Sequence, residues 1–116
     1  GPQGPQGSAG STGPQGPSGP SGPGNLSMNV VSGTAVTAIA GQRYILTNAS
    51  STTVTLPASP SAGDIVSVSA ANGLVTNVID NNSLKILGST QTITMDVSYM
   101  VIDLIYVNST LGWVFA

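Results

Sequence analysis

Residues 1–22 read GPQGPQGSAGSTGPQGPSGPSG, and glycine occupies every third position of this stretch. The phased glycines are Gly1, Gly4, Gly7, Gly10, Gly13, Gly16, Gly19 and Gly22. Six of the eight residues that directly follow them, counted as far as Pro23, are proline, and the two exceptions are Ser8 and Ser11. Three polyproline-II chains can wind together only if every third residue lacks a side chain, because that residue faces the crowded axis. The stretch therefore predicts a triple helix, which requires three chains.

A strict glycine period with abundant proline is typical of a collagen-like segment, whereas a flexible linker would carry its glycines out of phase. The third position of each triplet from Gln3 to Ser21 holds no proline, so this segment is suited to folding without hydroxyproline. It also contains no charged residue, so ion pairs between chains cannot fix their register. We expect a marginally stable triple helix whose register is imposed by the residues that follow.

The glycine phase ends at Pro23, Gly24 and Asn25, which we predict to be a hinge. Chains in a collagen-like helix are staggered by one residue, and a flexible junction is needed to join them to a symmetric trimeric domain. We divide the chain into a collagen-like shaft, residues 1–24, and a trimeric head, residues 25–116. The head is long enough for one small domain. Because the sequence begins at Gly1, we expect it to be part of a longer protein.

The head reads as an all-β domain because Val, Ile and Thr alternate with polar residues and are cut by Gly, Pro and Asn. Nine strands are predicted, over residues 34–40, 43–48, 52–56, 64–71, 74–79, 84–87, 91–97, 99–107 and 113–116. Asn72-Gly73 is a strong hairpin signal between the fourth and fifth of these strands. This number and spacing of strands is typical of a β-sandwich with a jelly-roll-like arrangement.

Composition excludes several classes of function. The chain has four acidic and two basic residues, a net charge of −2, and neither cysteine nor histidine. These numbers predict no disulfide, no thiolate metal site and no basic surface for nucleic acid or anionic lipid. No apolar run is long enough to span a bilayer. The expected partner is a second and third copy of the same chain, and neither nucleic acid nor a membrane is expected.

Catalytic chemistry is not predicted either. Without histidine or cysteine, the usual bases that activate a serine or threonine nucleophile are missing. The four carboxylates lie near turns or on separate predicted strands, so no acidic pair can be assigned for glycoside hydrolysis. We expect no enzymatic activity and no cofactor. Asp80-Asn81-Asn82-Ser83 carries oxygen ligands, but it lacks the spacing of an EF-hand loop and is interpreted as a hydrogen-bonded turn.

The strand predicted over residues 99–107 is apolar on both faces. One face carries Met100, Ile102, Leu104 and Tyr106, and the other carries Tyr99, Val101, Asp103, Ile105 and Val107. A strand with one solvated face should alternate with polar residues, so both faces are predicted to be buried. We assign the first face to the core and the second to a trimer interface near the three-fold axis.

Asp103 is the exception on the second face. A buried carboxylate needs a partner or a proton, so Asp103 should find a hydrogen-bond donor if this face is an interface. The alternative is that Asp103 lies at a solvated sheet edge, where a single charge limits aggregation.

Residues 55–64, TLPASPSAGD, followed by alternating Val and Ser, resemble the C-terminal domains of bacteriophage tail-fibre and capsid-fibre proteins. The ending Gly112-Trp113 and the collagen-like shaft are similar to features of the same family. The resemblance implies a trimeric fibre on the virion surface with a structural or attachment role and no catalytic residues. The alternative location is a bacterial cell or spore surface.

Two functions follow from this resemblance. The first is a structural fibre whose head trimerises the shaft, sets its register and contacts other virion proteins. The second is a receptor-binding tip that recognises a host-surface carbohydrate or protein, for which aromatic residues would form a stacking surface. We expect Tyr44, Tyr99, Tyr106, Trp113 and Phe115 to fill cores and subunit seams instead, because the domain has no other aromatic residues.

A peptide of residues 1–24 tests whether the shaft depends on the head. We expect this peptide to give no stable triple helix at room temperature, because it lacks hydroxyproline and loses both register and local concentration. Circular dichroism of the polyproline-type signal measures this, with the full chain as the control. A stable triple helix of the peptide alone would contradict a registering role for the head.

Overall fold

Nine strands form two sheets in this computed structural model, which describes residues 26–116. The strands are β1 (Ser27–Val31), β2 (Ala35–Thr37), β3 (Gln42–Leu46), β4 (Thr53–Thr55), β5 (Ile65–Ser69), β6 (Asn77–Asp80), β7 (Ile93–Met95), β8 (Val101–Asn108) and β9 (Gly112–Phe115). The described residues contain no helix, so the predicted all-β class is confirmed for the head. The eight phased glycines and the predicted hinge lie outside the described residues.

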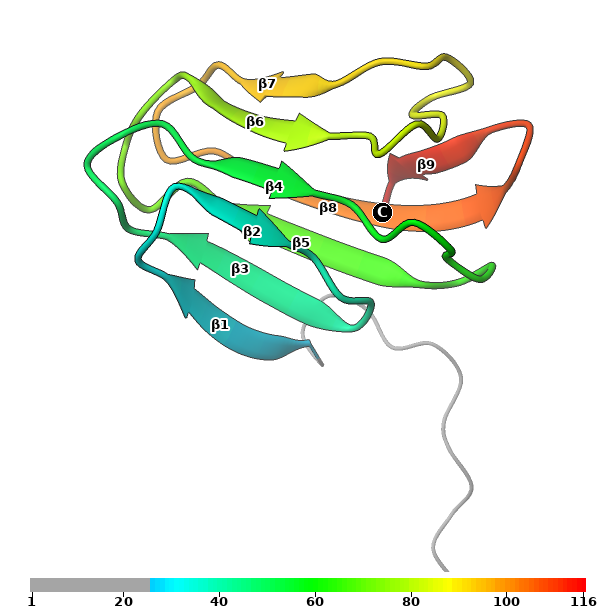
Figure 1. The fold of residues 1–116 in the computed structure, drawn as a ribbon, viewed down its shortest axis with the longest axis horizontal. Coiled ribbons are helices and arrows are strands. Elements are labelled where there is room, and N and C mark those ends of the chain that lie inside the picture. Colours follow the sequence, from blue (N-terminus) through cyan, green and yellow to red (C-terminus); the bar gives the residue numbers. More distant parts are fainter. Residues whose placement is uncertain (1–25) are drawn as a thin grey trace, which may run out of the picture.

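The two sheets form separate layers (Figure 1). One has five strands in the order β1-β3-β5-β8-β9, and the other has four in the order β2-β4-β6-β7. From β1 to β6, the chain crosses to the other sheet after every strand. Each strand therefore returns beside its predecessor in the same direction, and β1, β3 and β5 are parallel, as are β2, β4 and β6.

The first antiparallel pair, β6 with β7, forms where two consecutive strands stay in one sheet. This turn reverses the chain direction, so β8 then pairs antiparallel with β5, and β9 pairs antiparallel with β8. The jelly-roll-like arrangement expected from the sequence is therefore not the one observed, because a jelly roll is antiparallel throughout. Alternating apolar and polar residues fix which side of a strand is buried, but they do not fix which strand lies beside it.

The core lies between the layers. It is built by the inward residues of both sheets, such as Tyr44, Val66 and Leu104 from the larger sheet and Val54 and Ile79 from the smaller one. All of these side chains are at most 4 % exposed. Stacked sheets with interdigitated apolar side chains are the usual solution for domains of this size.

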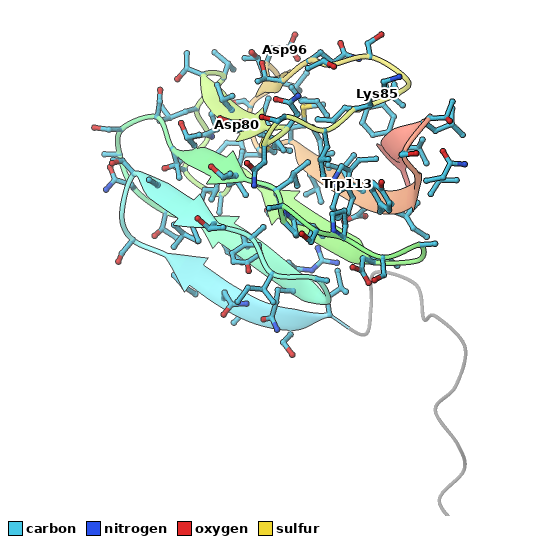
Figure 2. The ribbon with its side chains drawn as sticks, turned by 45° about the vertical axis from the view of Figure 1, so that its right-hand side comes forward. Asp80, Lys85, Asp96 and Trp113 are labelled. Carbon is cyan, nitrogen blue, oxygen red and sulfur yellow. The ribbon has the colours of Figure 1, made fainter. Side chains whose placement is uncertain are left out.

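Trp113 closes one side of this core. Figure 2 shows it between the layers, and it is completely buried. Tyr106 on the neighbouring strand packs against it edge to face, with ring centroids 5.5 Å apart. Such an aromatic pair stabilises the core beyond the area that it buries.

The predicted strands match the observed ones with two exceptions. The sequence did not predict β1, and residues 84–87 form only isolated bridges rather than a strand. The turn predicted at Asn72-Gly73 is present, with Gly73 at φ +74° and its amide donating to the Ala70 carbonyl. The predicted hairpin between the two flanking strands is wrong, because the chain crosses from β5 to the other sheet at this turn.

The segment around Lys85 covers the outer edge of β9. The Trp113 amide donates to the Lys85 carbonyl, and the Leu87 amide donates to the Trp113 carbonyl. These bonds leave no room for a side chain at Gly112, where a Cβ would lie 1.9 Å from the Lys85 carbonyl oxygen. Gly112 also has φ +72°, which only glycine adopts readily.

Gly112→Ala should therefore destabilise the head strongly. The left-handed conformation costs about 1–2 kcal/mol for a residue with a Cβ. The collision with the Lys85 backbone adds to this, so we expect a total loss of at least about 3 kcal/mol. Thermal unfolding followed by far-ultraviolet circular dichroism at fixed concentration measures the loss.

Gly33→Ala is the matched control, because nothing lies within 4 Å of the added methyl group. It should change stability by less than about 1 kcal/mol. Equal melting temperatures for the Gly112 and Gly33 variants would contradict the close approach of β9 and the Lys85 segment.

Candidate subunit interface

β8 has a neighbour on each side, β5 and β9, and its two faces differ as predicted. Ile102 and Leu104 are buried in the core, whereas Val101 on the opposite face is 50 % exposed. Asp103, Ile105 and Val107 on that opposite face are half-buried. The core face predicted from the sequence is therefore confirmed, and the face predicted to be an interface points away from the core.

The strand registers extend this second face over the whole five-stranded sheet. We call it the apolar face, and its side chains form three rows across the strands. One row is Val30, Ile45, Ser69 and Val101; the next is Met28, Arg43, Ser67 and Asp103; the third is Ile65, Ile105 and Val114. Val107 lies at the irregularity in the β8–β9 pairing between Tyr106 and Asn108, so it belongs to none of the three rows. Strand side chains alternate between faces, so these residues all lie on one side of the sheet.

The apolar face is most exposed on β1 and at the start of β8. Met28 and Val30 on the edge strand β1 are 68 % and 61 % exposed, and Val101 on β8 is half-exposed. Neighbouring exposed apolar side chains such as Met28 and Val30 are a feature of interaction sites.

The middle row is polar. Ser67 lies between Arg43 and Asp103 and is completely buried, although it points away from the core. Ser67 Oγ and Asp103 Oδ1 are both buried, and neither has a hydrogen-bond partner within the described residues.

A favourable burial term is therefore available to a molecule that covers this face. Fully burying a valine or methionine side chain contributes about 1.5–3 kcal/mol, so covering Met28, Val30 and Val101 would contribute about 3–5 kcal/mol per chain.

The outer face of the four-stranded sheet has a different character. Its outward side chains include Thr37, Thr53, Thr55 and Thr94, all exposed or half-exposed. Figure 2 shows Asp96 on this side of the molecule. Hydroxyl groups on a sheet surface are well solvated by water. The outward side of the four-stranded sheet is therefore richer in polar groups than the apolar face.

Tyr99 differs from the other four residues of the predicted interface, because it precedes β8 and does not follow the strand's alternation. Its backbone is left-handed, with φ +59°, and its side chain is 69 % exposed. The ring lies against Gly73, where a Cβ would come within 2.8 Å of the ring. Tyr99 therefore joins the loops before β6 and before β8, at the end of the domain away from the start of β1.

The aromatic residues follow the core prediction only in part. Tyr44 and Trp113 are buried and Tyr106 is half-buried, but Tyr99 and Phe115 are exposed. Within residues 26–116, no exposed aromatic ring lies in contact with Tyr99. The described residues thus offer a single exposed ring at that end and no aromatic surface for a glycan.

The Asx-rich turn at residues 80–83 is held by local hydrogen bonds, as predicted. The Asn82 amide donates to Asp80 Oδ1, and the Asn81 side chain donates to the Leu84 carbonyl. No cluster of three or more acidic side chains occurs in the described part of the chain. Residues 26–116 also include no helix that is long and apolar enough to cross a membrane.

The sequence matches no protein-family model and no curated protein. Its function must therefore be inferred from its residues and their geometry.

Asp103→Ala tests whether the apolar face is covered in the assembled protein. Asp103 lies on β8, between β5 and β9 in the strand order, and is half-buried. If a neighbouring chain donates to the carboxylate, the substitution leaves that donor unsatisfied and lowers stability by about 1–3 kcal/mol per chain. Thermal unfolding of the full chain at fixed concentration measures this.

The control is Asp96→Ala, which removes an exposed carboxylate from the other side of the molecule. We expect it to leave the melting temperature within about 2 °C of the parent, as for other exposed substitutions. An unchanged melting temperature for Asp103→Ala would remove Asp103 from any interface.

Proposed function

We propose that the protein is a homotrimeric fibre end, in which residues 25–116 gather three chains and set the register of the collagen-like shaft. The proposal rests on one observation above all, the unbroken glycine period of residues 1–22 directly preceding a β domain. A segment with this period is stable only as three chains. Something in each molecule must therefore bring three copies together.

The head is suited to this task for two reasons. The shaft carries no charged residue and no proline in its third positions, so it is poorly equipped to select a register or to hold three chains by itself. The head has a core of its own and, in addition, an apolar face that a single chain leaves partly exposed. Covering that face would supply the association energy that the shaft lacks.

We further propose that this fibre is part of a virion surface, where it contacts other virion proteins. The support is the resemblance of residues 55–64 and of the Gly112-Trp113 ending to phage fibre proteins, together with the shaft. The near absence of charge fits a structural role better than catalysis or nucleic-acid binding, because both of those need ionised groups at a site. The Arg43 and Lys85 side chains are the only cationic ones in the chain.

Light scattering of the full chain tests the proposal. We expect a mass of three times the 11.5 kDa chain. On heating, the polyproline-type signal should disappear before the β signal, because the shaft is short while the head buries apolar surface within and between chains. A monomeric full chain in native buffer would contradict the proposed function.

The double variant Gly10→Ala with Gly13→Ala separates the two parts. It puts two side chains at the axis and should abolish the polyproline-type signal. The mass should remain that of three chains, because the head is unchanged. Loss of the trimer in this variant would mean that the shaft, rather than the head, assembles the molecule.

A further inference from the structure

We infer that the apolar face of the five-stranded sheet is the surface through which three copies of this chain associate. This inference rests on the proposed function for the number of chains. It goes beyond the proposed function by naming the surface.

The occupant of the face is a copy of this chain because the glycine period demands that three chains run together. The period ends at residue 22, and β1 begins at Ser27. β1 is the edge strand of the five-stranded sheet, and its outward residues Met28 and Val30 belong to the apolar face. The segment that needs three chains is therefore only a few residues away in sequence from the face that needs covering.

The charges on the face also suit a second copy. Arg43 and Asp103 lie in the same row, on strands to either side of Ser67, so the face carries no net formal charge. Copies can then approach without net repulsion. A nucleic acid or an anionic surface would find no excess positive charge here to bind.

Lysine substitutions at exposed positions of the face test its location in the full chain. Val30→Lys and Val101→Lys alter side chains that are at least half-exposed in a single chain, so each chain should still fold. We expect the mass to fall from three chains to one at temperatures above the loss of the shaft signal. The emission of the single tryptophan, which is buried, should stay unchanged and show that the head is folded.

Thr37→Lys and Thr94→Lys are the matched controls, because they place the same charge on exposed strand positions of the other sheet. Both should remain trimers. A folded trimer of Val30→Lys and Val101→Lys would overturn the assignment of the face while leaving the trimeric function intact. Dissociation of the threonine variants instead would move the interface to the four-stranded sheet. A monomeric parent chain would refute the proposed function itself.

Discussion

The fold depends on the chain crossing from one sheet to the other after each of its first five strands. Every crossing places the next strand opposite its predecessor, so the inward residues of the two sheets meet and form one core. The same crossings make β1, β3 and β5 parallel neighbours, because each returns to the first sheet in the same direction. A parallel sheet usually has both faces covered, since its strands are buried on both sides. Here one face is covered by the second sheet, and the other leaves Met28, Val30 and Val101 at least half-exposed.

Sequence reasoning was successful where local chemistry decides the outcome. Alternation identified most strands, and turn residues identified where they end, including the hairpin at Asn108, whose side chain accepts from the Thr110 and Leu111 amides. Sequence reasoning failed where the outcome depends on which strands pair over long distances in the sequence. Asn72-Gly73 favours a turn, but these residues do not specify whether the chain then returns in the same sheet or crosses to the other one. β1 was missed because it is a five-residue strand whose inward side carries the polar residues Ser27 and Asn29.

The candidate interface was predictable only along a single strand. The sequence of β8 alone reveals two apolar faces, whichever strands lie beside it. Its period of two then divides its residues into two sets, one for each face of the sheet. The rest of the apolar face requires the registers of β1, β3, β5 and β9, which alternation does not supply. Tyr99 illustrates the limit. It has the right parity for the outward face, but its left-handed backbone takes it out of the strand.

The polar row across the apolar face has a physical consequence for assembly. Replacing a buried polar group with a well-packed apolar one is often neutral or stabilising, so this row is not explained by stability alone. A purely apolar sheet face can pack against a copy of itself in many registers with similar energy, because apolar contacts have no direction. Hydrogen bonds do have direction, and a single polar position can select one arrangement at some cost in stability. The shaft has no charge with which to choose its own register. In the proposed trimer, a polar row that favours one packing of the heads would pass a defined arrangement to residues 1–24 of the three chains.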